Sequence, residues 1–339
     1  MATDQDRPNA VDMTDIDLLT ATLTAIAGPR ATARLEQGRA SIILDVSGLE
    51  PTARDMLAAS VRAEVSALVG IDEVRVAMTS QRSQRQLIAV ASGKGGVGKS
   101  TVSANLAIAL HQLGRKVGLV DADIYGPSQP KLMGVEGSRP TAPDKKLLPV
   151  ETPYGVPLLS MGQLVEPDQA IAWRGPMAAG ALGQLVDADW GDADTIVVDM
   201  PPGTGDVQLT MIQKHRPAGV VIVSTPQDLA LIDARRAIDL FVKAGIPVIG
   251  LVENMAGYAC PSCGVISDPF GSGGTELAAD LLTLPFLGRI PLDIAIRTGS
   301  DGGHPPVTGN GPERAAFMEI ATIVRDWLDR GGNHAADFG

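Results

Sequence analysis

The chain has 339 residues, enough for one large domain and a small one. Its 39 Asp and Glu against 28 Lys and Arg give a formal charge of −11, which argues against nucleic acid as a partner, because neutralising phosphates needs clustered basic side chains. No apolar run approaches the ~18–20 residues of a membrane span, and residues 1–10 lack the basic and apolar regions of a secretory signal. We therefore expect a cytoplasmic protein without membrane contact.

The first eighty residues predict a small α+β domain behind a disordered tail at residues 1–10. Apolar spacing gives the expected order of its elements, which is a helix (16–26), a hairpin (31–46), a second helix (51–68) and a strand (74–78). No chemistry is assigned to this domain, which spans residues 11–80, and docking is its expected role. The polar run at 81–86 is the expected linker to a larger domain at 87–330, with a tail at 331–339.

A glycine-rich stretch follows a predicted strand at 87–91 and precedes a helical pattern. It consists of Gly93, Lys94, Gly95, Gly96, Val97, Gly98, Lys99, Ser100 and Thr101. A strand, a glycine-rich turn and a helix are the context in which G-x-x-x-x-G-K-[ST] binds nucleotide phosphates. We expect Lys99 to reach the β- and γ-phosphates of ATP and Ser100 to bind Mg²⁺. Because a loop lysine carries phosphate charge and not core packing, replacing Lys99 is expected to abolish hydrolysis and to leave the fold intact.

Lys94 is a second lysine, at the start of the same loop. It is either a solvated surface residue or a residue that crosses a dimer interface to the partner's nucleotide. The string K-G-G-V-G-K-[ST] resembles the deviant Walker A loop of the MinD/ParA/Mrp superfamily, in which the crossing lysine is the defining feature. The resemblance implies a homodimer and a catalytic role for Lys94.

Three aspartates follow predicted strands, where side chains point into the ligand crevice of an α/β sheet. Asp121 and Asp123 end the strand at 116–120, and Asp199 ends the strand at 195–198, the arrangement of a Walker B carboxylate that holds Mg²⁺. Residues 121–128 resemble switch I of the Mrp/ApbC family, which implies that Asp123 positions the attacking water and that Asp121 lies near Mg²⁺. Residues 199–206 resemble its switch II.

Two further strand ends carry candidate site residues. Pro226 follows the strand at 220–224, and Asn254 ends the strand at 247–252 together with Glu253. An ordinary strand-to-loop connection explains either residue as well. In the superfamily that the loop resembles, the corresponding Asn contacts adenine and the segment around the Pro lines the base.

Cys260 and Cys263 are the only cysteines of the chain, and they form a C-x-x-C pair. Two thiolates cannot close a zinc or iron–sulfur site that needs four ligands, and none of the four histidines has ligand spacing to another. A two-fold dimer supplies four thiolates at its axis. The spacing leaves Zn²⁺, [2Fe–2S] and [4Fe–4S] open, whereas a thioredoxin-type redox pair belongs at a helix N-terminus.

Together these motifs resemble the Mrp/ApbC family of P-loop iron–sulfur cluster carriers over roughly residues 86–330. The resemblance implies an α/β P-loop NTPase fold, with a mostly parallel sheet flanked by helices, behind the small α+β domain. It also implies slow ATP hydrolysis and a [4Fe–4S] cluster held between subunits by Cys260 and Cys263. The cluster assembly machinery would be the donor, and apo iron–sulfur proteins would be the recipients.

Two alternatives stay open. A MinD/ParA-like positioning ATPase would need a basic amphipathic C-terminal helix or a basic face. The predicted helix at 312–330 is about neutral, and its apolar stripe favours core packing. A zinc-stapled regulatory ATPase keeps the fold and changes only the metal.

Overall fold

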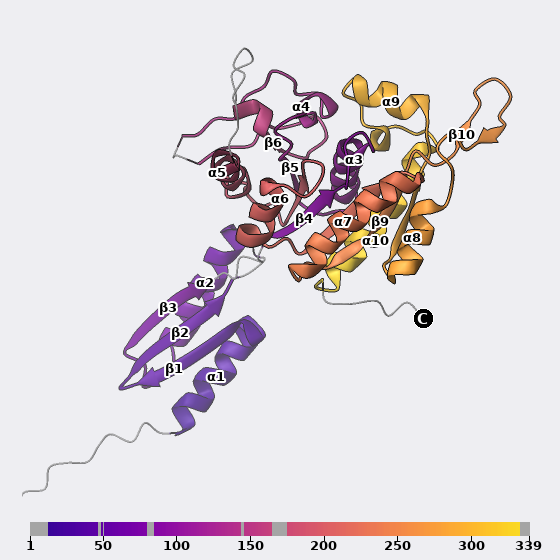
Figure 1. The fold of residues 1–339 in the computed structure, drawn as a ribbon. Helices are drawn as coiled ribbons and strands as arrows, with labels where there is room; N and C mark the ends of the chain where they lie inside the picture. The colour runs from indigo at the N-terminus through magenta and orange to yellow at the C-terminus, as the bar shows by residue number, and fades with distance from the viewer. Residues whose placement is uncertain are drawn as a thin grey trace, which may run out of the picture. The chain divides into compact units, whose positions relative to one another are not determined.

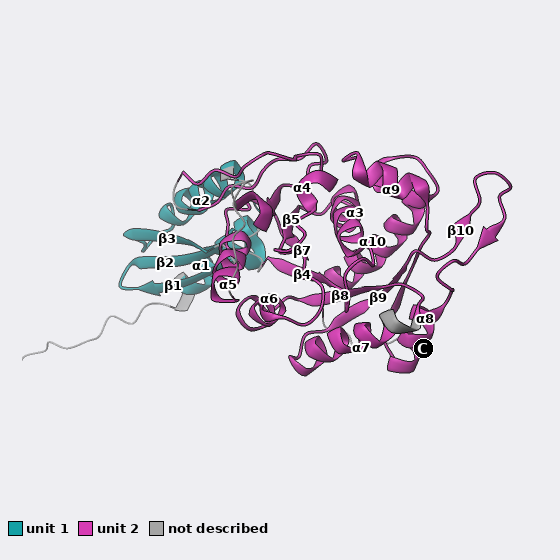
Figure 2. Ribbon diagram, turned by 45° about the horizontal axis from the view of Figure 1, so that its top comes forward, with its two compact units in different colours: residues 1–84 teal, residues 85–339 magenta. Residues whose placement is uncertain are grey.

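The structure, a computed structural model, describes residues 13–46, 49, 51–79, 85–143, 146–164 and 175–332. The chain divides into two compact units, Met1–Gln84 and Arg85–Gly339 (Figure 2). The expected tail at 1–10 lies outside the described residues, as do most of the expected linker and most of the C-terminal tail. Residue 86 of that linker belongs to the first strand of the larger unit.

The smaller unit is a three-stranded sheet with two helices on one face, as the apolar spacing predicts. Its elements are α1 (Met13–Ala27), β1 (Ala31–Glu36), β2 (Arg39–Asp45), α2 (Pro51–Ser66) and β3 (Glu73–Thr79). β1 and β2 are antiparallel, and β2 and β3 are parallel. The two-residue turn between β1 and β2 has positive φ at Gln37 (48°) and Gly38 (76°), which matches the right-handed twist of a hairpin.

The larger unit is built on a seven-stranded, fully parallel sheet (Figure 1). Its strands, in spatial order, are β12 (Phe286–Ile290), β9 (Val248–Asn254), β8 (Gly219–Ser224), β4 (Gln86–Ala91), β7 (Thr195–Asp199), β5 (Val117–Asp121) and β6 (Leu158–Ser160). Apart from β12 and the first residues of β4 and β9, the strand residues are buried, which explains their nearly continuous apolar sequence.

Helices cover both faces of this sheet. One face carries α3 (Lys99–Gln112) and α10 (Glu313–Asp329), and the other carries α5 (Gly175–Val186), α7 (Asp228–Lys243) and α8 (Gly274–Leu282). The remaining helical segments are α4 (Gln129–Leu132), α6 (Asp206–Thr210), a π-helical turn (Met211–His215) and α9 (Ile294–Asp301). In the described part of the chain, 3₁₀ turns cover Gly28–Arg30, Met161–Leu164 and Pro306–Thr308.

The C-terminal helix α10 buries its apolar stripe in the core, as predicted. Phe317, Ile320 and Val324 are each at most 2% exposed. Within the described part of the chain, no helix is long and apolar enough to cross a membrane.

The short hairpin of β10 (Tyr258–Ala259) and β11 (Ile266–Ser267) extends away from the body of the larger unit (Figure 1). It leaves the same sheet edge as the loops that follow β4, β5 and β7, because all the large-sheet strands are parallel. The turn of this hairpin carries both cysteines.

Candidate nucleotide and metal site

The glycine-rich stretch forms a compact loop between β4 and α3, as its sequence predicts. Gly98 precedes the helix with φ 81°, a left-handed conformation that side chains rarely adopt. A Cβ at Gly93 would lie 2.0 Å from the backbone carbon of Asp233, so only glycine fits where the loop meets α7. The first turn of α3 therefore presents its backbone N–H groups at the carboxyl edge of the sheet, where they favour an anion.

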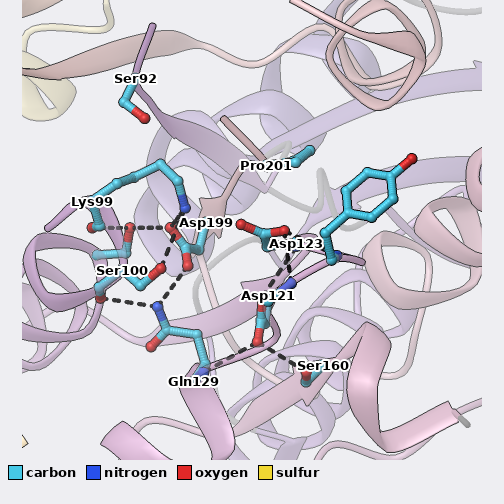
Figure 3. A network of polar contacts seen from close by, with 12 residues as sticks. Ser92, Lys99, Ser100, Asp121, Asp123, Gln129, Ser160, Asp199 and Pro201 are labelled. Atoms are coloured by element: carbon cyan, nitrogen blue, oxygen red, sulfur yellow. Dashed lines mark hydrogen bonds and ion pairs between the residues drawn. The ribbon is translucent and has the colours of Figure 1, made fainter. Parts of the chain in front are cut away.

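Lys99 and Asp199 form a buried ion pair at the centre of the site (Figure 3). The Lys99 Nζ lies 2.5 Å from Asp199 Oδ1, and the two side chains are 5% and 0% exposed. Ser103 Oγ donates to the same Asp199 oxygen at 2.8 Å, and Lys99 Nζ reaches Ser100 Oγ at 3.3 Å. The phosphate loop and the expected Walker B carboxylate thus meet directly, and bound phosphates would compete with Asp199 for the ammonium group.

Asp121 is a second buried carboxylate beside Asp199. Its Oδ2 accepts from Ser160 Oγ at 2.9 Å and from the Gln129 backbone N–H at 3.1 Å (Figure 3). Burial, and then the negative charge of Asp199, raise the pKa of Asp121 to about 7. Two carboxylates that repel each other, next to the Ser100 hydroxyl, provide hard oxygen ligands of the kind that Mg²⁺ prefers, so the donor set fits the expected metal.

The raised pKa of Asp121 makes folding stability depend on pH. The folded protein holds this proton up to about pH 7, whereas the pKa of an Asp in the unfolded chain is the ordinary 3.8. The carboxyl therefore makes its full contribution to stability below its pKa in the unfolded chain. This contribution is lost as the pH rises through its pKa in the folded protein. Asp121→Asn should remove this slope, on the order of a few kcal/mol between about pH 4 and about pH 7, measured by urea unfolding at a series of pH values.

Asp192→Asn is the matched control for that experiment. Asp192 is exposed, and its hydrogen bond to Lys116 lowers its pKa, so its contribution has the opposite sign and is lost as pH falls. The control should not flatten the slope that Asp121 causes. If Asp121→Asn keeps the slope of the unmodified protein, the proton is not on this carboxyl.

Asp123 lies at the start of the switch I segment, residues 121–128, and is 8% exposed. Its Oδ1 accepts from the backbone N–H groups of Tyr125 and Gly126, at 3.1 and 3.2 Å, so the carboxylate closes its own turn. The Tyr125 side chain beyond it is 86% exposed. The structure fixes the position of Asp123, and its role toward the attacking water stays a prediction.

Lys94 does not take part in the Lys99–Asp199 network. Its Nζ lies 3.5 Å from Oε1 of Gln227, which directly precedes α7. The loop start is tied to the switch II segment, residues 199–206, because Gly203 N–H donates to the Ser92 carbonyl at 3.0 Å. The role of Lys94 across an interface stays a prediction.

Asn254 lies at the end of β9 and contacts the phosphate loop itself. Its Nδ2 donates to the Val97 carbonyl at 2.8 Å, so it supports the loop. Pro226 lies close to the first residue of α8, because a Cβ at Gly274 would meet the Pro226 carbonyl oxygen at 2.3 Å. Their predicted contacts with adenine stay predictions.

Sequence reasoning missed three polar residues of this edge. Gln129 and Ser103 contact Asp199, and the fully buried Glu253 holds the start of α8 by accepting from Gly273 N–H and Thr275 N–H at 3.1 and 2.8 Å. Glu253 also pairs with Arg289 of β12 at 3.0 Å. The available signal for Glu253 was its position as a charged residue directly after an apolar strand sequence. Such a residue is buried only when it has a partner, so the sequence could have predicted an ion pair at this position.

The cysteines lie in the turn of the β10–β11 hairpin. Cys260 N–H donates to the Val265 carbonyl at 3.0 Å, and Gly264 N–H donates back to the Cys260 carbonyl at 2.8 Å. The Ser262 and Cys263 backbone N–H groups point at the Cys260 sulfur and lower its pKa, which favours the thiolate that binds metals. Cys263 is exposed.

No group of three or more His, Cys, Asp or Glu side chains that could hold a metal ion occurs among the described residues. That the two thiols form half of a four-ligand site stays a prediction. The apolar side chains that follow them, Val265 and Ile266, are 63% and 72% exposed.

The fold and this site define a P-loop nucleoside triphosphatase. Residues 83–326 match the ParA-type family described as NUBPL iron-transfer P-loop NTPases. An iron–sulfur cluster carrier protein of Pseudomonas fragi is 46% identical over 267 residues, which cover 77% of this chain and 93% of that relative. The chain belongs to this family of iron-transfer P-loop NTPases.

Two solved structures are similar to the larger unit. A nucleotide-binding protein of Archaeoglobus fulgidus in complex with ADP has a TM-score of 0.60 and 39% identity, covering 70% of this chain and 93% of its own. The cell-division ATPase MinD of Pyrococcus furiosus has a TM-score of 0.55 and 26% identity, covering 71% and 99%. These similarities confirm the predicted fold class.

Proposed function

We propose that this protein is a slow ATPase that carries an iron–sulfur cluster as cargo, works as a homodimer and delivers the cluster to apoproteins. The observation that carries the proposal is that one chain combines a P-loop nucleotide site with a C-x-x-C thiol pair in a hairpin turn, in which Cys260 is partly exposed and Cys263 is exposed. Two such pairs would supply the four thiolates that a cluster needs. The cluster carrier of Pseudomonas fragi, at 46% identity, supports the same cargo. A cytoplasmic location and a donor in the cluster assembly machinery belong to this proposal.

The nucleotide chemistry follows from the buried network. Lys99 would exchange Asp199 for the β- and γ-phosphates, and Ser100 and Asp199 would hold Mg²⁺, with Asp199 acting through water and Asp121 nearby. Bound Mg²⁺ neutralises phosphate charge. Asp123 would orient the attacking water, since its second carboxylate oxygen is not used in the turn that its Oδ1 closes.

Nucleotide state would change cluster affinity through the geometry of the dimer. Four thiolates converge only when two hairpins face each other, so any change in subunit arrangement changes the ligand set. The tie between Ser92 and Gly203 gives the phosphate loop a direct contact with the switch II segment. A [4Fe–4S] cluster is the expected cargo.

Anaerobic reconstitution with iron and sulfide tests the proposal. One [4Fe–4S] cluster shared by two chains gives about two iron atoms per chain and a visible absorbance. The loaded protein should then restore activity to an apoenzyme that requires such a cluster. Zinc retained in place of iron would support the zinc-stapled ATPase instead, and absence of transfer from a loaded dimer would contradict the carrier role.

Lys94 is tested by mixing two inactive subunits. One carries Lys94→Ala, and the other carries Lys99→Ala together with Asp199→Asn, because Lys99→Ala alone leaves the Asp199 carboxylate without its cation. In a mixed dimer, one composite site then contains both lysines and the other contains neither. Random assortment should restore about a quarter of the normal hydrolysis, since half of the dimers are mixed and each has one intact site.

Each homodimer alone is the control and should be inactive. Mixed dimers that form, as shown by differently tagged subunits, and yet hydrolyse no ATP would rule out the crossing role of Lys94.

A further inference from the structure

Gln129 is a buried side chain at the start of α4 that contacts three parts of the nucleotide site (Figure 3). Its Nε2 donates to Asp199 Oδ2 and to the Ser100 carbonyl, both at 2.9 Å. Its backbone N–H donates to Asp121 Oδ2 at 3.1 Å. One residue therefore joins the end of the switch I segment, the first turn of α3 and the carboxylate at the end of β7.

These contacts decide how the Asp199 carboxylate is oriented. Lys99 and Ser103 occupy its Oδ1, and Gln129 occupies its Oδ2. A rotation of the carboxylate would break hydrogen bonds at both oxygens, and both Gln129 and Asp199 are fully buried. Hydrogen bonds of this kind, from outside the ligand shell, commonly fix a ligating carboxylate and set metal affinity.

Stability alone does not account for a glutamine here. Both of its amide protons are used, but its Oε1 is buried and has no hydrogen-bond partner among the described residues. The cost of such an orphaned acceptor is similar in size to what a hydrogen bond contributes, so the gain from the two donated bonds is largely offset. The arrangement favours a role in the site over a role in the core.

We propose that Gln129 is a positioning residue for the metal site: its amide orients Asp199 for Mg²⁺ and links that carboxylate to the switch I segment. The proposal rests on the nucleotide chemistry proposed above. It requires no contact between Gln129 and the metal or the nucleotide, because Gln129 acts through Asp199.

Gln129→Met tests the proposal, since methionine keeps the length of the side chain and removes both donors. Mn²⁺, which replaces Mg²⁺ and is seen by electron paramagnetic resonance, should bind the protein–ADP complex about 10-fold more weakly. ADP affinity measured in EDTA should not change. In steady-state hydrolysis the metal concentration at half-maximal rate should rise, while kcat at saturating metal falls much less.

Gln163→Met is the matched control. Gln163 is also buried, and it bonds the Ser160 N–H at 2.9 Å and the Ser138 carbonyl at 3.2 Å, without a hydrogen bond to Asp199 or Ser100. It should bind Mn²⁺–ADP as the unmodified protein does. Gln129→Asn, which keeps the amide on a shorter side chain, serves as a second variant if Gln129→Met does not fold, and it too should weaken Mn²⁺ binding.

The outcomes separate this inference from the proposed function. Folded Gln129 variants that bind Mn²⁺–ADP no more weakly than the Gln163→Met control would overturn the positioning role and leave the proposed function intact. An unmodified protein that binds no Mn²⁺ with ADP would overturn both.

Discussion

Replacing Lys99 with alanine is expected to abolish ATP hydrolysis and also to destabilise the folded protein. The loss of hydrolysis follows from removing the cation that stabilises phosphate charge, an effect of ~10²-fold or more. The loss of stability follows from burial: Asp199 is fully buried, and Lys99 is its ion-pair partner at 2.5 Å. Removing one partner of a buried pair leaves an uncompensated charge and typically costs about 3–5 kcal/mol.

This expected loss of stability differs from the expectation based on sequence alone, which is that replacing a loop lysine leaves the fold intact. The sequence places Lys99 in a loop before a helix, where solvent exposure is the ordinary state. The structure places its ammonium group against Asp199 at the carboxyl end of β7, with the side chain only 5% exposed. Because a buried carboxylate meets the lysine inside the site, we now expect a loss of stability in place of an intact fold.

The double variant Lys99→Ala/Asp199→Asn separates the two effects. It removes both charges, and the asparagine at position 199 can accept from Gln129 with its amide oxygen and donate to Ser103 Oγ with its NH₂ group. Urea unfolding should show that the double variant regains most of the stability lost in Lys99→Ala, while hydrolysis stays absent in both. Unchanged hydrolysis in Lys99→Ala would end the phosphate-loop interpretation, and unchanged stability would show that the ion pair contributes nothing net.

Sequence reasoning predicted the elements whose signals are local. The strands β4, β5 and β7 are short apolar runs, and each is followed directly by the glycine-rich loop or ends in an aspartate. The apolar run and the residue that marks its end lie within a few positions of each other, so the signal is local. Alternating apolar residues around a turn at residues 36–38 predict the small β1–β2 hairpin, and in the structure Glu36 still pairs with Arg39, so the turn is Gln37 and Gly38. Packing of α10 follows from its apolar stripe.

Contacts between distant segments were not predictable in this way. Gln129 and Asp199 are 70 positions apart in the chain, and Glu253 and Arg289 are 36 apart, so neither pairing has a local pattern. The seven-strand order was not predictable either, because β4, the first strand of the sheet in the chain, lies between β8 and β7. Asn254 shows the same limit, since its contact with Val97 depends on β9 ending beside the loop.

Replacing either Cys260 or Cys263 with serine is expected to remove the iron and the visible absorbance of the reconstituted protein. A serine hydroxyl stays protonated at neutral pH and does not replace a thiolate on iron, and each change removes two of the four ligands of a bridged cluster. The reconstituted variants should therefore also dimerise more weakly, measured by analytical ultracentrifugation. Nucleotide binding should persist, because the hairpin turn shares no hydrogen bond with the phosphate loop in the described part of the chain.

Ser262→Ala is the matched control, because it lies between the two cysteines and keeps both thiols. The backbone N–H of residue 262 that lowers the pKa of Cys260 remains, so cluster loading should stay close to that of the unmodified protein. If the serine variants keep their iron, the thiols are not its ligands. Four iron atoms per chain in the unmodified protein would mean that each chain closes its own site, which the two thiols of one hairpin cannot do without ligands from elsewhere.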